Sequence, residues 1–573
     1  MLRYLLFLAL ALPAAAQETI IREVYDPKTD THVEVVALFS KPSSGGYLPV
    51  RVKIANNLKT DRSIQLSFDS GTNYSQGTHA TSSFGFTADA GKTVTQDILV
   101  PLCPSVAGYS WGANVTTRLT GSLGDANNSM NAIADNSQPA VLLSEVLFTP
   151  NASSLDAAMG SSGSYGGRNE FAAKFDPKQL PDNWLAFSGY DSVLMTDIDW
   201  SNMPSSGRNA LLSWLRLGGQ LVIYSTGAAD AKSLGIPADA SFGSVLVKRI
   251  ASDLKLDPKP TLDLVSHTNP NVTRSGSIKS DFDGSWPLQT YFGSQTFQYG
   301  LFIAVLIVFA VVVGPINLFV FAKSGQRHKL FITTPLISLV ASLILIALII
   351  IQDGFGGSGM RRVLMEVRPD GDQNAAYLHQ EQFCRTGVLT GSRFTIAEPS
   401  IFSPVPIATS RWARFTNSSD TRGNFNLQPS DGKLNASGDW FQSRSEHGHL
   451  LSAVVSTRGR IERTAEAHTL LSTFDFPIDT LFFLDNDEQW YRADGVTTGK
   501  RFGTTAVDLS MVQPLIQKEI SGFASRNGKM LLRSWQRPGC YVAVTNAAPG
   551  VATHPGIRWK ETRTVITGPV LTP

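Results

Sequence analysis

Two long apolar runs near the middle of the chain constrain its fold more than any other feature. Leu301–Ala322 and Leu330–Ile351 each hold 22 residues without a charged side chain. As helices, each run is ~33 Å long at ~1.5 Å per residue, enough to cross a hydrocarbon core of ~30 Å. A buried helix of a soluble protein is the alternative, but two such runs in succession are typical of a membrane hairpin. The sequence therefore predicts a two-helix transmembrane hairpin over residues 299–353.

The amino-terminal end predicts a cleavable signal peptide over residues 1–16. Arg3 supplies a short positive region, Leu5–Leu12 is an apolar segment, and Ala14–Ala16 has the small side chains of a cleavage site. A third membrane anchor is the alternative, although the apolar segment is short for a span. Export predicts that the residues after the signal peptide lie outside the cytoplasm.

The loop between the two apolar runs carries positive charge. Lys323, Arg327 and Lys329 lie within it, together with His328. Positive residues are enriched in cytoplasmic loops of membrane proteins, so the loop is expected inside. Signal peptide and loop charge then agree on one topology. The hairpin spans a bacterial inner membrane, with the lipid bilayer around it, and both large soluble regions lie in the periplasm.

Length and charge restrict the remaining possibilities. With 573 residues the chain is too long for one core and is expected to form several domains. The 49 basic and 47 acidic side chains nearly balance, so no nucleic-acid partner is predicted. Cys103, Cys384 and Cys540 are too few for a disulfide framework. Cys384 and Cys540 are expected in one domain, either paired or as separate thiols.

Two exported domains are predicted before the hairpin. In residues 17–136, Val50–Ile54 and Ile64–Phe68 alternate between apolar and polar side chains, which indicates strands of an immunoglobulin-like β-sandwich. Residues 137–255 instead hold short continuous apolar runs separated by a helical pattern with a Ser205 or Ser206 cap. Those runs are Ala140–Leu143, Asp191–Asp197 and Gln220–Tyr224. Strand, helix, strand in this order predicts an α/β domain with a parallel sheet.

Several segments of this region resemble a known group of proteins. The segments are Leu180–Trp184, Tyr190–Leu194, Ala210–Val222, Gly314–Asn317 and Thr333–Leu336. They are similar to bacterial envelope membrane proteins that carry a class I glutamine amidotransferase-like domain and a two-helix membrane hairpin. The resemblance implies that the α/β domain has this fold in a catalytically degenerate form.

The same resemblance supplies a catalytic hypothesis centred on Ser225. Class I amidotransferases hold a nucleophile on a tight turn between a strand and a helix, and Ser225 occupies that position, with Gly227 following. Ile223 stands where a glycine is usual. The only histidine between Ser225 and the first apolar run is His267, in a segment where Asn269 replaces the family's acid. A serine hydrolase is therefore an alternative hypothesis, and no catalytic residue is assigned.

The residues on either side of the hairpin give few chemical signals. Residues 256–298 are expected to form an irregular linker to the membrane, and 360–573 a β-rich periplasmic domain. His447 and His449 have strand spacing but no third ligand nearby, so they are interpreted as solvent-facing polar residues. Asp485–Asp487 lacks the glycine and distal glutamate of a calcium loop and predicts a turn. No metal or cofactor is expected.

Asn317 is the one strongly polar side chain inside the hairpin. Thr333, Thr334 and Ser338 are expected at a similar depth on the second helix, so Asn317 is predicted to bond to one of them. Pro315 removes a backbone donor and predicts a kink near this point. Asn317 at a helix interface also supports a second alternative, an accessory subunit of a membrane transporter.

These observations predict a multidomain membrane protein with exported domains on both sides of a helical hairpin. The favoured function is recognition or scaffolding in the periplasm, as a non-catalytic subunit of a bacterial cell-envelope complex with protein partners.

Overall fold

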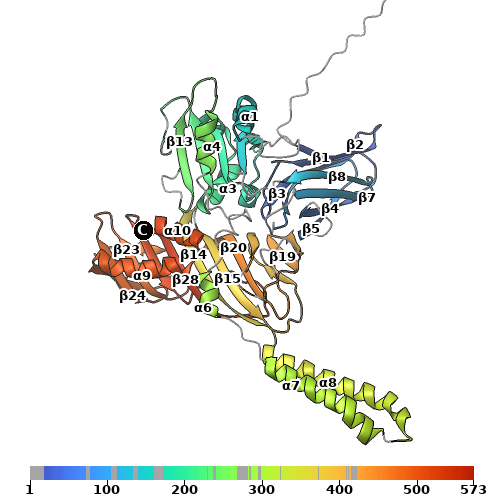
Figure 1. The fold of residues 1–573 in the computed structure, drawn as a ribbon. Helices are drawn as coiled ribbons and strands as arrows, with labels where there is room; N and C mark the ends of the chain where they lie inside the picture. The colour runs from blue at the N-terminus through green and yellow to red at the C-terminus, as the bar shows by residue number, and fades with distance from the viewer. Residues whose placement is uncertain are drawn as a thin grey trace, which may run out of the picture.

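The chain is multidomain and rich in strands, and an apolar two-helix hairpin projects from its body (Figure 1). A computed structural model gives this fold. The structure describes residues 18–72, 78–104, 113–132, 140–159, 172–228, 230–236, 241–266, 282, 286–293, 299–322, 324–371, 373–407, 410, 412–414 and 423–572. The proposed signal peptide and His267 lie outside the described residues.

The amino-terminal region is a β-sandwich. One sheet has the order β1-β2-β3-β6, formed by Glu18–Asp26, Thr31–Ala37, Tyr47–Asn56 and Lys92–Pro101. The facing sheet contains β4, β5, β7 and β8, formed by Arg62–Thr72, Thr78–Ala88, Ala113–Gly121 and Ala126–Ala132. The two predicted strands lie in β3 and β4. Their alternating apolar side chains, including Val50, Val52 and Leu66, fill the space between the sheets.

The second sheet of the sandwich continues into the carboxy-terminal half of the chain. Strands β18 (Gly423–Ser430), β19 (Lys433–Gly438) and β16 (Phe394–Ile396) extend it to seven strands. β18 runs parallel to the start of β5, where Gly423 pairs with Thr78. The regions before and after the hairpin therefore share one sheet, whereas the sequence alone predicts separate domains.

The next domain has the predicted parallel sheet. Its strand order is β10-β9-β11-β12-β13, formed by Ala172–Phe175, Val141–Ser144, Ser192–Thr196, Gln220–Ser225 and Ser244–Arg249. Helices α1 (Glu145–Met159) and α4 (Pro258–Ser266) pack with one face. Helix α3 (Ser205–Arg216) and the short η2 (Trp184–Phe187) cover the other face. The result is a doubly wound α/β domain, and α4 corrects the expectation that residue 256 begins an irregular linker.

A twelve-stranded sheet dominates the carboxy-terminal region. Its main strands are β17 (Ser400–Val405), β20 (Glu446–Thr457), β15 (Gln373–Thr386), β14 (Gly357–Asp370), β28 (Ile557–Leu571), β27 (Cys540–Thr545), β23 (Ile478–Leu484), β24 (Trp490–Val496) and β26 (Thr505–Val507). The short β21 (Ile461–Arg463), β22 (Thr469–Ser472) and β25 (Arg501–Gly503) lie off this path. Helices α6 (Pro287–Phe292), α9 (Leu509–Gly522) and α10 (Ser525–Ser534) pack against it. The β-rich expectation for this region is confirmed.

Strand β15 connects the α/β domain with the segment that leads to the hairpin. Near its start, the hydroxyl of Tyr377 accepts a hydrogen bond of 2.8 Å from Arg216 of α3. Farther along, the Glu381 carboxylate accepts a hydrogen bond of 2.8 Å from the indole of Trp286, just before α6. The second half of the predicted linker is thus also ordered in part, because α6 is docked on the sheet.

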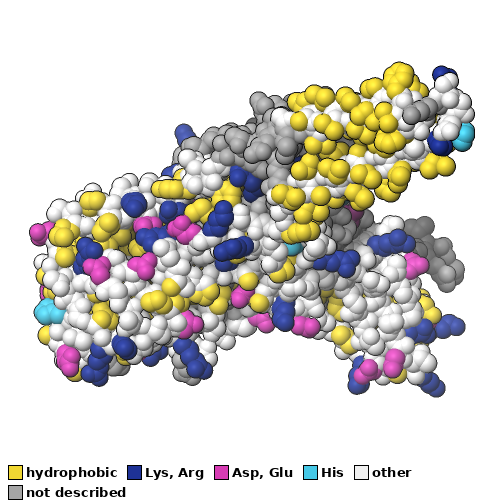
Figure 2. All heavy atoms as spheres, turned by 90° about the horizontal axis from the view of Figure 1, so that it is seen from below, with side chains coloured by type: hydrophobic (Ala, Val, Ile, Leu, Met, Phe, Trp, Pro, Cys, Tyr) yellow, Lys and Arg dark blue, Asp and Glu magenta, His cyan; other side chains and the backbone are white. Residues whose placement is uncertain are grey.

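The hairpin consists of α7 (Tyr299–Val311), the π-helical η3 (Val312–Phe321) and α8 (Leu330–Asp353). Two segments are long and apolar enough to cross a membrane, Ile303–Phe321 and Arg327–Leu348. Figure 2 shows apolar side chains covering the hairpin, with basic and histidine side chains at its tip. This surface is suited to lipid and unsuited to water.

The polar contact predicted inside the hairpin is present. The Asn317 side-chain amide is fully buried and donates a hydrogen bond of 2.9 Å to the hydroxyl of Thr334. Thr333 instead donates to the carbonyl of Lys329 in its own helix at 3.1 Å. Around Pro315 the first helix widens to a π-helical turn, in which the Ala322 amide bonds to the Asn317 carbonyl at 2.9 Å.

We expect Asn317→Leu to weaken the association of the two helices without preventing insertion. A hydrogen bond of this kind in a membrane contributes roughly 0.6–2 kcal/mol, which is small beside the insertion of two apolar helices. Thr334→Val should cause a similar loss and add little to Asn317→Leu, while Thr333→Val is the matched control without effect. Steric trapping of the hairpin in bicelles measures the loss, and fully additive losses would contradict a shared bond.

Candidate functional site

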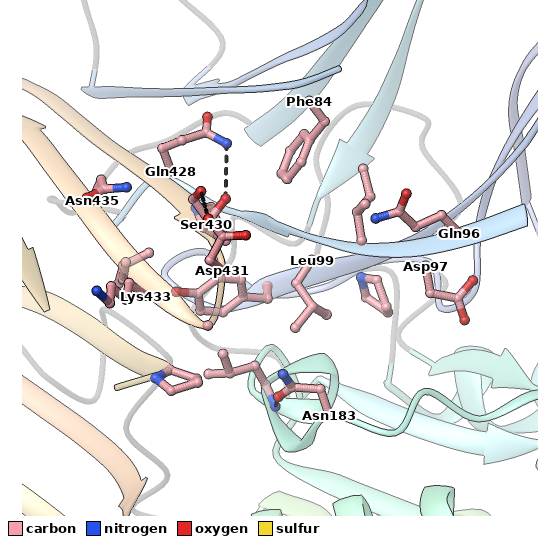
Figure 3. Close-up of a pocket in the computed structure, with 18 of the residues that line it drawn as sticks. Phe84, Gln96, Asp97, Leu99, Asn183, Gln428, Ser430, Asp431, Lys433 and Asn435 are labelled. Carbon is pink, nitrogen blue, oxygen red and sulfur yellow. Dashed lines mark hydrogen bonds between the residues drawn. The ribbon is translucent and has the colours of Figure 1, made fainter. Parts of the chain in front are cut away.

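The candidate site is a groove of about 680 Å³ where three domains meet. Its volume lies in the range of ligand pockets, roughly 300–1,000 Å³. The sandwich contributes β5 and β6, the α/β domain contributes residues 181–183, and the carboxy-terminal region contributes the β18–β19 turn. Figure 3 shows Gln428, Ser430 and Asp431 across the groove from Gln96 and Asp97, with Asn183 on a third side.

Local sequence chemistry positions each wall of this groove. Asp431 and Gly432 form the two-residue turn between β18 and β19, and both have positive φ, 50° and 73°. Such turns favour Asp-Gly because glycine adopts this backbone conformation without a Cβ clash. On the opposite wall, Asn183 caps η2 by accepting a 3.0 Å hydrogen bond from the amide of Leu185.

Polar contacts across the domain boundaries hold the walls in place. Arg51 of β3 forms a two-pronged ion pair with Asp97 of β6, at 2.7 and 2.8 Å, and bonds to Gln179 of the α/β domain at 2.9 Å. The bond to Asp97 raises the pKa of Arg51. Tyr47 is buried and donates a 2.8 Å hydrogen bond to the Ser400 carbonyl of β17. The groove is therefore a preformed feature of the assembled body.

The surface of the groove combines polar and apolar groups. Asp182, Asp431 and Lys433 are exposed at its rim, and Phe84 and Leu99 are half-buried in its wall. The Gln428 side chain is already occupied on one side, because it accepts a 2.7 Å hydrogen bond from the Ser83 amide. Such a surface can hold a polar ligand by hydrogen bonds and orient it by a few apolar contacts.

The structure places Ser225, the candidate nucleophile, in a buried position. Ser225 ends β12 and is 2% exposed. Its hydroxyl donates to the Asp197 carboxylate at 2.6 Å and accepts from the Gly227 amide at 3.1 Å. The Ser225 hydroxyl is thus shielded from solvent. Its bond to the Asp197 carboxylate links β12 to the start of α2 (Asp197–Asn202). No histidine side chain is recorded in contact with Ser225 within the described part of the chain.

The histidine pair of β20 is buried, so the expectation of solvent-facing side chains is wrong. The His447 and His449 rings stack with centroids 6.1 Å apart, and the His449 ring lies 2.9 Å from the Trp440 carbonyl. Burial lowers the pKa of His447 to about 4 and that of His449 well below its ordinary value. Among the residues that the structure describes, no group of three or more His, Cys, Asp or Glu is placed to hold a metal.

The remaining sequence candidates have structural roles. Asp485 forms the predicted turn between β23 and β24, where its carboxylate accepts from the amides of Asp487 and Gln489 at 3.0 and 2.8 Å. Cys384 and Cys540 lie on β15 and β27 and are not joined in a disulfide. None of these residues contributes to the groove.

The sequence does not predict the groove, because its walls come from six separate segments of the chain. One local signal was available: Asp431-Gly432 between two alternating segments is typical of a β-hairpin. That signal predicts the turn and gives no information about the domain it faces.

Comparison with known proteins identifies no family: no family model and no curated protein matches the chain. Among solved structures, the sporulation control protein Spo0M from Bacillus subtilis is similar over 18% of this chain and 49% of its own, with 15% identity and a TM-score of 0.13. A cycloisomaltooligosaccharide glucanotransferase from Paenibacillus sp. is similar over 35% of this chain and 29% of its own, with 12% identity and a TM-score of 0.18. β-Glucuronidase 2 from Bacteroides uniformis is similar over 35% and 24%, with 12% identity and a TM-score of 0.14. These TM-scores are too low to support any argument about this chain.

Proposed function

We propose that the protein is a membrane-anchored recognition or scaffolding protein of the bacterial cell envelope, acting as a non-catalytic subunit in the periplasm. The observation that carries this proposal is the groove shared by three domains. A surface assembled from the sandwich, the α/β domain and the carboxy-terminal region exists only in the folded body. Binding at that surface thus depends on the whole exported assembly.

The shared seven-stranded sheet supports the arrangement on the membrane. β5 precedes the hairpin and β18 follows it, yet the two strands pair. Paired strands lie in one compartment, so the two flanks are on the same side of any membrane that the hairpin crosses. Two helices with a basic connecting loop fit this topology, with the loop in the cytoplasm.

The experiment for this proposal is to fill the groove. Gly85 lies in the groove wall, and a Cβ added there has no heavy atom within 4 Å. Gly85→Trp should therefore fold normally, occupy the groove and fail to complement deletion of the gene. Gly503→Trp is the matched control, because Gly503 is a strand glycine with equally open surroundings outside the groove. Full complementation by Gly85→Trp would show that recognition does not use this groove.

The serine hydrolase alternative is tested by Ser225→Ala. We expect this variant to complement the deletion as well as the unchanged protein. Its measurable effect should be a stability loss of roughly 1–3 kcal/mol, because the Asp197 carboxylate loses a buried hydrogen-bond donor. Denaturant unfolding measures that loss. A phenotype equal to deletion at normal protein level would support catalysis by Ser225 instead.

A further inference from the structure

Strand β6 is an unpaired edge, and its free side faces the groove. In the described part of the chain β6 pairs only with β3 and ends the four-stranded sheet. An edge strand presents backbone N–H and C=O groups that have no partner in the sheet. The groove lining includes Gln96, Asp97, Ile98 and Leu99 of this strand.

The hydrogen-bond register shows which of these residues face outward. The amide of Leu38, next to β2, bonds to the Pro49 carbonyl of β3 at 2.9 Å. Backbone groups of successive residues point to opposite sides of a strand. The backbone N–H and C=O groups of odd-numbered residues of β3 therefore point toward β2. Those of even-numbered residues, such as Val50 and Val52, point toward β6.

The partners of these even-numbered residues complete the register. Val50 pairs with Ile98 and Val52 with Gln96, so Ile98 and Gln96 bond to β3. The bond of 2.9 Å from the Leu102 amide to the Gly46 carbonyl continues the same register. It follows that the backbone groups of Asp97 and Leu99 point away from β3 and into the groove.

The neighbouring edge of β5 shows how such groups are satisfied. The Thr81 amide donates to the Asn426 side chain at 2.8 Å, and the Ser83 amide donates to the Gln428 side chain at 2.7 Å. Side-chain amides of β18 thus stand in for the backbone of a paired strand. By the same alternation the next outward amide is that of Gly85, which also lines the groove.

We propose that the groove binds an extended segment of a partner polypeptide, which adds to β6 as a further strand by pairing with Asp97 and Leu99. This proposal rests on the proposed function and names the partner's chemistry. The lining part of β6, Gln96 to Leu99, spans about 14 Å at ~3.4 Å per residue, and strand addition of this kind gives affinity through main-chain bonds.

The side chains of the groove set the preference for the added segment. Alternate residues of a strand point to opposite faces, so one set of alternate residues of the segment meets Phe84, which packs on the sandwich core, and the other set meets Leu99, which packs on the α/β core. The groove lining carries two exposed carboxylates at its rim, Asp182 and Asp431, and one cation, Lys433. The carboxylate of Asp97 is already paired with the guanidinium of Arg51. The groove therefore selects segments with apolar residues on both faces and a Lys or Arg residue.

The test uses a phage-displayed library of random nonapeptides, selected on the purified full-length protein and counter-selected on Gly85→Trp. Selected peptides should bind Leu99→Pro about tenfold or more weakly, since proline removes the outward amide while leaving the bonds to β3 intact. Two controls should stay within about threefold: Leu99→Ala, which retains the amide, and Thr95→Pro, which has the same outward register but does not line the groove.

A second measurement does not depend on folding of the proline variant. N-methylation at each position of a selected peptide should weaken binding at every second position, because only alternate amides face β6. A uniform response, equal binding to Leu99→Pro, or selection of no peptide would overturn strand addition. So would an oligosaccharide array ligand whose binding is lost in Gly85→Trp and kept in Leu99→Pro. If Gly85→Trp still abolishes complementation in those cases, groove recognition stands and strand addition alone is wrong.

Discussion

Glu381→Ala is expected to cause a large loss of stability, greater than that of Ser225→Ala. The Glu381 carboxylate is fully buried and accepts from the Trp286 indole at 2.8 Å, the Ala524 amide at 3.0 Å and the Asn527 side chain at 2.7 Å. Removal of one partner from a buried charged network costs roughly 3–5 kcal/mol, because the remaining donors lose their acceptor. Denaturant unfolding of the full-length protein measures this loss.

The same substitution should release the segment that leads to the hairpin. Trp286 immediately precedes α6, and its ring also packs edge-on against Phe383 at 5.7 Å. Without the Glu381 acceptor, the indole N–H has no partner in this pocket. We expect faster protease cleavage near α6 in Glu381→Ala. Unchanged cleavage together with unchanged stability would contradict the role assigned to this carboxylate.

Glu381→Gln separates the hydrogen bonds from the shape of the side chain. A glutamine retains one acceptor oxygen for Ala524 and Asn527 but places its NH₂ group against the Trp286 N–H, so two donors face each other. Trp286→Phe removes that conflict. It should therefore cost less stability in the Glu381→Gln background than in the unchanged protein, and equal costs would show that the two side chains are not coupled.

The stability difference between Glu381→Gln and the unchanged protein should also depend on pH. Burial raises the pKa of Glu381 from 4.5 to about 7, against the opposing effect of its hydrogen bonds. A raised folded-state pKa contributes stability that is present below about 4.5 and lost as the pH rises through about 7. His379 and His447 act in the opposite sense: burial lowers their pKa values from 6.5 to about 3 and about 4. Their contribution is lost as the pH falls below about 6.5, in both proteins alike, so it cancels in the difference.

Local patterns account for the parts of this fold that the sequence predicts. The hairpin follows from two uncharged apolar runs, and the α/β domain follows from continuous apolar strands around the α3 pattern. The Asn317 contact follows from depth alone, because a polar side chain in lipid needs a partner and Thr334 is at the same level. Each of these predictions depends on residues close in sequence or constrained by the membrane.

The missed features depend on contacts between distant segments. Pairing of β5 with β18 joins residues about 345 positions apart, and the alternation of each strand alone does not specify that partner. His447 and His449 were predicted to face solvent because no third metal ligand lies near them in the sequence. That strand is covered on both faces, so its polar side chains are buried as well. The groove is also of this kind, since its walls are strand edges and turns from six separate segments.

The second large effect is an all-or-none labelling pattern across the membrane. Cysteines introduced at Thr60 and Thr498 should react with a membrane-impermeant maleimide added to intact spheroplasts, while one at Ser324 should react only after permeabilisation. All three positions are exposed, and Cys540→Ser removes the one native thiol that is not fully buried. The physical reason is that β5, before the hairpin, pairs with β18, after it, so both flanks share a compartment, and the basic loop favours the cytoplasm.

Labelling at Ser324 alone would invert the proposed topology. Labelling at only one of Thr60 and Thr498 would place the flanks on opposite sides, which the shared sheet does not permit.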